Sequence, residues 1–352
     1  MQTGEDETTA SAAQPSQQAT HDASPEVTHT RAFRNKRLMH RIGIAASVVL
    51  FAVSVGVLVY IIRELDIEEV KAAYNRTSWR QIAMALGLAA LSYLMLTGYD
   101  ALALRQVSAT PVRYSLTALA SFTSFAVSFT LGFPLLTAAT VRYWVYSTIG
   151  LGAGAIASLT LIAGLTFWLG MSIVLGTVMV LQPVATGSFT RLSPDLNLYI
   201  GAAILTAILG YVLWIAFKPR SLTMQGWTFH LPRFRVSLAQ MLLGAADVCV
   251  ACGVLYVLLP QGHGVPFATV IAAYVFANLL GIASHAPGGI GVFEATILLA
   301  LPGIPREALL GSVLLYRCCY YILPFIVAIW LLGLREILLR SRRMRREIGG
   351  EP

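Results

Sequence analysis

The chain has 352 residues, of which 57% are hydrophobic and only 12% are charged, and its formal net charge is +8. A soluble domain carries about 25% charged residues, so this composition excludes an ordinary soluble protein and is typical of a membrane protein. The basic excess does not indicate nucleic-acid binding, because it gathers at the two ends of the apolar region, where it predicts cytoplasmic flanks. The basic residues are Arg31, Arg34, Lys36, Arg37 and Arg41 on one side, and Arg335, Arg340, Arg342, Arg343, Arg345 and Arg346 on the other.

Residues 1–41 begin as a polar stretch without periodicity and end in the first basic cluster, which predicts a disordered cytoplasmic tail. A membrane domain is expected over 42–333, and a second basic cytoplasmic tail over 334–352. No polar stretch inside the membrane domain is long enough for an inserted soluble domain, so any function must be built from the spans and their connections. The predicted spans are 42–62, 81–101, 114–132, 153–181, 197–217, 237–259, 266–283 and 307–333.

Two segments, 131–152 and 283–305, do not fit a simple series of spans. Each follows a span, is interrupted near a proline (Pro134 or Pro287) and restarts as a short helix. The second restart covers about ten residues, or about 15 Å, which is half of a bilayer. Paired interruptions in corresponding halves of a chain are typical of a transporter binding site. We therefore expect a possible internal repeat, formed by 42–181 and 197–333.

The number of crossings depends on whether these two segments cross the membrane. If both are re-entrant, the chain has eight crossings, and the basic 218–236 loop lies opposite the two tails. If both cross, there are ten crossings, and that loop joins the tails on the cytoplasmic side. Helix length favours eight and charge favours ten. The sequence predicts an all-α integral membrane protein with about eight transmembrane helices, two broken or re-entrant elements and both termini in the cytoplasm.

Ionisable side chains inside apolar segments are costly, at about 2.5–3.5 kcal/mol each, and they often mark function. We expect Asp100 and Arg105 near an interface, and the other four deeper. Arg142 and Glu294 lie on the two interrupted segments, which makes them a natural pair between the repeats. Two interpretations stay open and are compatible: ion pairs that hold the helices together, or the lining of a polar cavity. The six residues are Asp100, Arg105, Arg142, Asp247, Glu294 and Arg317.

The second interruption contains Gly288, Gly289 and Gly291, which permit a sharp turn after Pro287. The N-terminus of the following helix favours an anion, either a lipid phosphate or the carboxylate of Glu294 itself.

Further along the chain, Arg317 offers a planar fork to a phosphate, and Tyr320 and Tyr321 add hydroxyl groups within one turn. His285 is interpreted as a structural residue. The sequence predicts no catalytic residue, metal site, disulfide or cofactor, and the four cysteines, Cys249, Cys252, Cys318 and Cys319, are interpreted as small packing residues.

Four stretches of this sequence together resemble a known family. It is similar to the transmembrane, flippase-type region of bacterial lysyl-phosphatidylglycerol synthases and to the stand-alone membrane proteins that share that region. The resemblance implies a multi-pass protein of the bacterial inner membrane that handles a phospholipid or a lipid-linked headgroup. The stretches are GYDALALR (98–105), LGFPLLTAATVRYWVY (131–146), PGGIGVFEA (287–295) and YRCCYYILP (316–324).

In two-part members of that family, a separate soluble domain attaches the amino acid to the lipid. This sequence holds no such domain, so we expect translocation of a phospholipid or an aminoacylated headgroup rather than catalysis. The alternative is an enzyme subunit or a scaffold for a separate lipid-modifying synthase. Membrane phospholipid is the expected partner, nucleic acid is not expected, and the sequence does not indicate an oligomeric state. The expected substrate-binding residues are Arg142, Asp247, Gly288, Gly289, Gly291, Glu294, Arg317, Tyr320 and Tyr321, with Pro134 and Pro287 as structural breaks.

Overall fold

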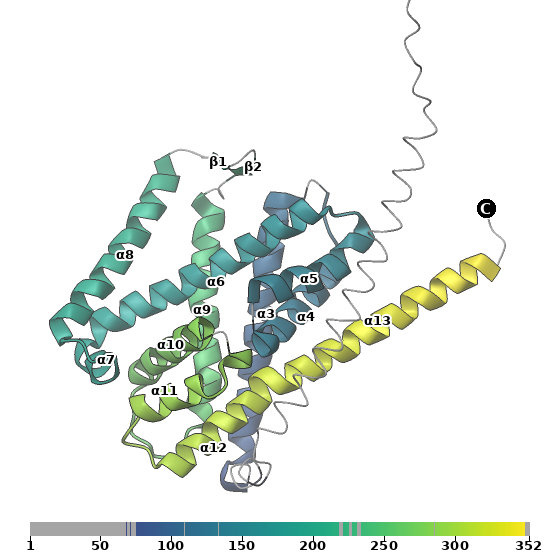
Figure 1. Ribbon diagram of the computed structural model, residues 1–352. Coiled ribbons are helices and arrows are strands. Elements are labelled where there is room, and N and C mark those ends of the chain that lie inside the picture. Colours follow the sequence, from purple (N-terminus) through teal and green to yellow (C-terminus); the bar gives the residue numbers. More distant parts are fainter. Residues whose placement is uncertain are drawn as a thin grey trace, which may run out of the picture. The chain divides into compact units, whose positions relative to one another are not determined.

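The computed structural model describes residues 68, 71, 75–108, 110–132, 134–217, 221–224, 227–230, 234–284 and 286–348. The predicted tail 1–41, the first predicted span 42–62 and His285 lie outside the described residues. Helices make up most of the described chain (Figure 1), as the composition predicts.

The helices begin and end close to the predicted boundaries. Six helices of the described chain are long and apolar enough to cross a membrane: α3, α4, α6, α8, α9 and the continuous run from α12 to α13. The predicted span 266–283 appears as a shorter helix of 17 residues. The helices are α3 (Trp79–Val107), α4 (Tyr114–Leu131), α5 (Pro134–Tyr146), α6 (Ala153–Leu181), α7 (Pro183–Thr190), α8 (Pro194–Phe217), α9 (Phe234–Leu258), α10 (Phe267–Ala283), α11 (Val292–Ala300), α12 (Arg306–Arg317) and α13 (Leu323–Ile348); short 3₁₀ turns η1 (Ser147–Ile149) and η2 (Pro287–Gly289) and a π-helix η3 (Cys318–Ile322) join some of them.

The 218–236 connection differs from the loop that the sequence suggested. Two short strands, β1 (Ser221–Met224) and β2 (Trp227–His230), pair antiparallel within it, and Ser221 lies opposite His230. Both strands carry β-branched or aromatic residues, which favour strands over helices. The connection thus contains a short two-stranded hairpin where the sequence suggested only a loop.

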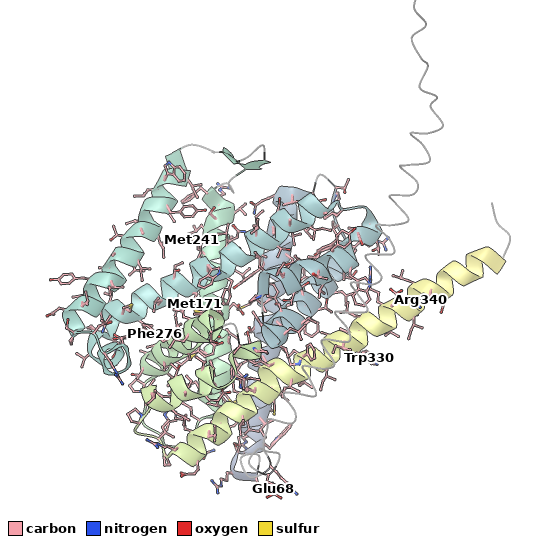
Figure 2. The ribbon with its side chains drawn as sticks, in the orientation of Figure 1. Glu68, Met171, Met241, Phe276, Trp330 and Arg340 are labelled. Atoms are coloured by element: carbon pink, nitrogen blue, oxygen red, sulfur yellow. The ribbon has the colours of Figure 1, made fainter. Side chains whose placement is uncertain are left out.

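Helices α3 and α9 pack against each other along their length. Gln81, in the first turn of α3, donates to the carbonyl oxygens of Val257 (2.9 Å) and Leu259 (3.1 Å) at the end of α9, so α3 and α9 run antiparallel. Helices α8 and α9 each pack against α6 (Figure 1). Outward faces are apolar, as on α13, where Trp330 is 64% exposed (Figure 2). Such a surface fits a lipid environment.

Glycines allow α6 and α9 to touch backbone to backbone. A Cβ atom added at Gly244 of α9 would lie 2.6 Å from the carbonyl oxygen of Thr166 and 3.0 Å from the Cα of Gly170, both on α6. Small residues at such crossings are typical of helix packing in membranes, where close contact replaces the hydrophobic driving force.

Candidate functional site

Each interrupted segment folds back on the helix before it. In the first hairpin, α5 returns along α4, and the guanidinium carbon of Arg142 lies 4.9 Å from the centre of the Phe125 ring. In the second, α11 returns along α10, where the rings of Phe293 and Tyr274 meet edge to face at 5.9 Å. We call these the α4–α5 and α10–α11 hairpins.

The tips of the two hairpins touch. Gly132 ends α4 with a φ of 77°, a conformation that favours glycine, and a Cβ atom added there would lie 3.5 Å from the Cα of Pro287. Gly288, with a φ of 60°, lies against the α4 end, since its added Cβ would be 3.5 Å from the carbonyl oxygen of Thr130. The two breaks, at Pro134 and Pro287, are 153 residues apart in the chain and are therefore brought into direct contact by the fold.

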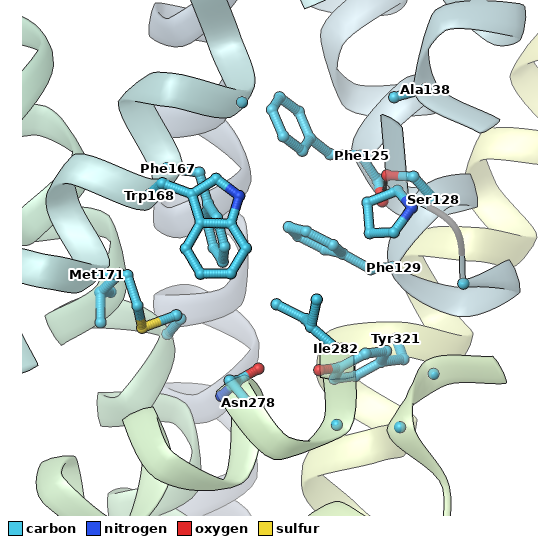
Figure 3. A pocket seen from close by; sticks show the side chains of 18 of the residues that line it. Phe125, Ser128, Phe129, Ala138, Phe167, Trp168, Met171, Asn278, Ile282 and Tyr321 are labelled. Atoms are coloured by element: carbon cyan, nitrogen blue, oxygen red, sulfur yellow. Dashed lines mark hydrogen bonds between the residues drawn. The ribbon is translucent and has the colours of Figure 1, made fainter. Parts of the chain in front are cut away.

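A cavity of about 310 Å³ lies beside the touching tips. Its walls are largely aromatic and aliphatic: Phe125 and Phe129 of α4 lie across from Phe167 and Trp168 of α6 (Figure 3). The expected polar cavity is thus an apolar cavity with a few polar groups. The polar or glycine residues among those lining it are Ser128, Gly132, Arg142, Thr160, Gly164, Asp247, Tyr274, Asn278, Gly281, Gly288, Gly289, Tyr320 and Tyr321.

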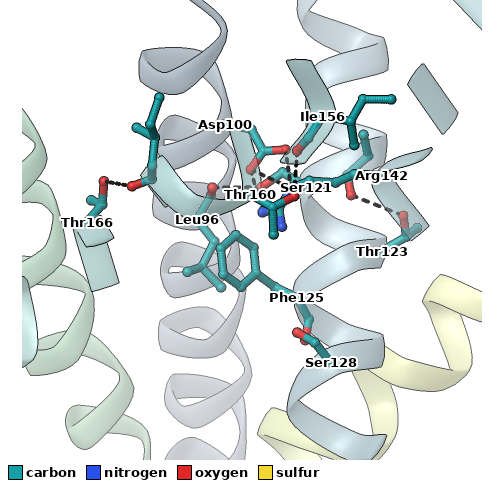
Figure 4. Close-up of polar contacts among 12 residues, drawn as sticks. Leu96, Asp100, Ser121, Thr123, Phe125, Ser128, Arg142, Ile156, Thr160 and Thr166 are labelled. Atoms are coloured by element: carbon teal, nitrogen blue, oxygen red, sulfur yellow. Dashed lines mark hydrogen bonds and ion pairs between the residues drawn. The ribbon is translucent and has the colours of Figure 1, made fainter. Parts of the chain in front are cut away.

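Arg142 reaches the cavity while its side chain is held by Asp100 (Figure 4). Its Nη2 donates to Asp100 Oδ1 at 2.7 Å, and its Nε lies 3.0 Å from Oδ2. The two residues are 1% and 0% exposed, so the charges are fully enclosed. Tyr146 donates to the same carboxylate at 3.3 Å. The remaining guanidinium nitrogen, Nη1, makes no hydrogen bond within the described residues, which leaves one donor for a ligand.

Arg317, which is buried, and Glu294, which is partly buried, form the second ion pair. Glu294 also accepts from the backbone N–H of Gly291 (2.8 Å) and thereby caps α11. Arg317 Nη1 donates to the carbonyl oxygen of Gly288 at 3.0 Å, and its planar group lies 5.6 Å from the Tyr321 ring centre. Within the described chain, Arg317 Nη2 is buried without a hydrogen-bond partner. These contacts fix the second break, at Pro287–Gly291, against the C-terminal end of α12.

Asp247 lies on α9 at the cavity wall, 3% exposed, and forms no ion pair within the described chain. Ser92 donates to its Oδ1 at 2.5 Å and Tyr99 to its Oδ2 at 3.0 Å. The Ser92 hydroxyl is also 2.8 Å from that of Tyr320, which lines the cavity. The hydroxyl groups of Ser92 on α3 and Tyr320 on η3 thus connect the carboxylate to the cavity.

The π-helix η3 explains the position of Tyr320. Pro324 has no N–H and cannot donate to the carbonyl oxygen of Tyr320, the acceptor four residues earlier. The hydroxyl of Tyr93 donates to that oxygen instead, at 3.1 Å. π-Helical turns often occur at functional sites. The stretch YRCCYYILP (316–324) contains this proline, but its sequence did not predict the π-helix.

The structure pairs Arg142 with a different acid from the one that the sequence predicted. The predicted Arg142–Glu294 pair is wrong, because α5 folds onto α4 and α3, where Asp100 is the nearby acid. Asp100 is fully buried beside Arg142, whereas Arg105 is exposed.

Six of the predicted binding residues line the cavity, and Gly291, Glu294 and Arg317 do not. Sequence reasoning also missed Ser92 and Tyr99. Their only signal was their place on the helix that carries Asp100.

No metal site was expected, and the described residues contain no group of three or more His, Cys, Asp or Glu that could hold a metal ion. The four cysteines are unpaired thiols, and Cys252 is fully buried. They act as small packing groups in this fold.

Comparison with known proteins gives two relatives that match most of the chain. The uncharacterized protein slr0712 of Synechocystis is 34% identical over 86% of this chain and 94% of its own length. The inner membrane protein YbhN of Escherichia coli is 28% identical over 85% of this chain and 94% of its own length.

A third similarity is local. A phosphatidylglycerol lysyltransferase of Staphylococcus aureus is 41% identical over 25% of this chain, which is 10% of that enzyme. Residues 44–328 match the family described as lysylphosphatidylglycerol synthase TM region. That match covers the α4–α5 and α10–α11 hairpins and the ion pairs of Arg142 and Arg317. The chain therefore belongs to the lysylphosphatidylglycerol synthase TM region family.

Proposed function

We propose that this membrane protein moves a phospholipid, with an aminoacylated or other amine-bearing headgroup, between the two leaflets of the bilayer. The observation that carries the proposal is the contact between two interrupted helices beside a cavity that holds Arg142 and Asp247. Interrupted helices of this kind surround transporter binding sites. The names of the lysyltransferase relatives support a lysine-bearing phosphatidylglycerol as the first substrate to test.

The phosphate of such a lipid would bind Arg142. Asp100 holds two of the three guanidinium nitrogens, so the side chain is oriented before the ligand arrives. The third nitrogen, Nη1, donates to a phosphate oxygen in the proposal, as a charge-assisted hydrogen bond. Tyr320, Tyr321 and the turn at Gly288 and Gly289 complete the headgroup site.

Arg317 and Glu294 would act as positioning residues. Their pair, together with the bonds to Gly288 and Gly291, fixes the second break next to the cavity. Loss of the pair would therefore free the tip of the α10–α11 hairpin. In this proposal that tip moves when the cavity opens toward one leaflet.

The acyl chains would remain in the bilayer. Leu135 of α5 and Trp168 of α6 line the cavity and are also 52% and 45% exposed, so the cavity reaches the apolar surface between these two helices. An apolar rim suits lipid tails, while the buried donors suit a headgroup.

The two hairpins would enter the membrane from opposite faces. In this proposal each hairpin returns to the side from which it entered and does not cross the membrane. Between the end of α8 and the end of α13, the chain then crosses twice, through α9 and through α12–α13. The connection between α8 and α9 therefore lies on the same side as the end of α13. That connection carries Lys218, Arg220, Arg233 and Arg235, so both basic regions would be cytoplasmic. This topology would place both tails and the basic connection on the cytoplasmic side of an inner membrane.

Reconstitution tests the proposal. The purified protein is placed in vesicles that carry a trace of fluorescent lysyl-phosphatidylglycerol, phosphatidylglycerol or phosphatidylethanolamine, and a membrane-impermeant quencher reports leaflet exchange. We expect exchange of the lysyl lipid above that of protein-free vesicles. Ala138→Trp places an indole into the cavity and should stop it, whereas the matched change Ala207→Trp lies on the exposed face of α8 and should not.

Absence of exchange for every lipid, or full activity of Ala138→Trp, would contradict the proposal. Cells that lack the protein offer a second outcome. If they lose a specific lipid product while the leaflet distribution of the remaining lipids is unchanged, the alternative role is favoured, as a subunit or scaffold of a lipid-modifying enzyme.

A further inference from the structure

The charges around the cavity do not balance. Arg142 is paired with Asp100, and Arg317 is paired with Glu294, so each pair is neutral. Among the described residues, Asp247 is the acid that lines the cavity without an ion-pair partner, and its ionised form would leave one negative charge enclosed. A lone charge enclosed at bilayer depth is costly, and such a residue usually marks an ion or proton pathway.

The carboxyl group of Asp247 sits halfway along α9, which crosses α3 and α6 near the same level. Its neighbours on α3, α10 and η3 provide hydroxyl groups but no cation. The titratable groups that face it are Tyr93 and Tyr99 on α3, Tyr274 on α10, Tyr320 on η3 and Cys249 on α9 itself, and the α6 sequence contains no ionisable residue. A cationic group in the cavity would therefore have the carboxylate of Asp247 as its counter-ion.

A proton has a route from this carboxyl group to the cavity. Ser92 lies between Asp247 Oδ1 (2.5 Å) and the Tyr320 hydroxyl (2.8 Å). Each hydroxyl can donate one hydrogen bond and accept another, so a proton given to Ser92 can be matched by one that leaves Tyr320. Tyr320 lines the cavity, where the proton passes to water.

We propose that Asp247 is protonated while the cavity holds no cation, and that it releases its proton when an amine-bearing headgroup enters. The inference rests on the proposed lipid translocation and adds its coupling: the protein exchanges a proton for a cationic lipid. The carboxylic acid becomes a carboxylate, the proton leaves through Ser92 and Tyr320, and the ammonium group of the headgroup replaces its charge. A lysyl-phosphatidylglycerol headgroup carries two ammonium groups and one phosphate, so it brings one net positive charge for the proton that leaves, and the enclosed charge stays constant.

Proton release tests the inference without transport. Purified protein in weakly buffered detergent near neutral pH receives a permanently cationic dioleoyl trimethylammonium lipid, which has no proton of its own, and a pH dye records the change. We expect release of about one proton per chain. Asp247→Asn keeps the shape of the side chain and should release none. Asp195→Asn, in the exposed first turn of α8, is the matched control and should behave like the wild type.

Vesicles with an imposed pH gradient test the coupling. We expect lysyl-phosphatidylglycerol exchange to speed up when protons flow opposite to the lipid, and Asp247→Asn to remove that response. Exchange that proceeds at the same rate with and without a gradient would overturn the inference while leaving the proposed translocation intact. Proton release in detergent without any lipid exchange would support Asp247 as the cation site and contradict the translocation proposal instead. Absence of proton release from the wild type would overturn the inference by itself.

Discussion

Removal of Asp100 should be among the most damaging single changes in this protein. Asp100→Ala leaves the Arg142 guanidinium enclosed, with no acid beside it, because Asp100 is its ion-pair partner within the described chain. Breaking a buried ion pair from one side costs about 3–5 kcal/mol, since the surviving charge keeps its desolvation penalty. The 2.7 Å contact and the near-zero exposure of both residues put this pair at the upper end of that range.

The double variant Asp100→Asn/Arg142→Gln should be much milder than Asp100→Ala. It removes both charges and leaves two amides of similar volume that can hydrogen-bond to each other, so no uncompensated charge remains. Glu336→Ala provides a matched control, because it breaks an exposed pair with Arg340 on α13, where the expected cost is about 0.3–0.5 kcal/mol.

Equilibrium unfolding in mixed micelles, followed by circular dichroism, gives the free energy of unfolding for each variant. The expected order, from most to least destabilised, is Asp100→Ala, then the double variant, then Glu336→Ala. A cost of Asp100→Ala no greater than that of Glu336→Ala would contradict this expectation, as would a double variant that is the least stable of the three.

Three further predictions concern packing and topology. Gly244→Ala should destabilise the protein by about 1–3 kcal/mol in the same unfolding assay, because its new methyl group meets the α6 backbone, whereas Gly210→Ala on α8 meets nothing within 4 Å and should cost no stability. Tyr93→Phe removes the donor to the Tyr320 carbonyl oxygen and should lower the free energy of unfolding by about 1–3 kcal/mol. An unchanged free energy of unfolding would contradict the role given to this hydrogen bond. Gln225→Cys in a cysteine-free background should react with an impermeant maleimide from the cytoplasmic side alone, and labelling from the outer side would reject the proposed topology.

Local signals in the sequence predicted the breaks well. Gly132 and Pro134 end one helix and start another, and Pro287 with its glycines does the same, because glycine and proline act on the backbone where they stand. The capping of α11 by Glu294 follows from the same local logic, and it was one of the two alternatives left open.

Partner choice could not be predicted from the same signals. The sequence allows Arg142 to pair with either Asp100 or Glu294. The direction of α5 decides between them, and it depends on how α5 packs along α4 beside α3. The sequence did not predict the short hairpin β1–β2 or the π-helix η3. The residues of β1–β2 suit a loop about as well as strands, and those of η3 suit an α-helix about as well as a π-helix. The aromatic wall of the cavity likewise arises from helices that are distant in sequence.

The central claim is that a lipid headgroup lies between the two hairpins during its passage. A phosphatidylglycerol analogue with a photoreactive group on its headgroup, crosslinked in vesicles and mapped by mass spectrometry, tests it most directly. The account predicts crosslinks on both hairpins and on η3, at Ala138, Asn278 and Tyr320, and their loss when unlabelled lysyl-phosphatidylglycerol is added. Crosslinks confined to outward-facing positions such as Ala207 on α8, with none at the cavity, would contradict it.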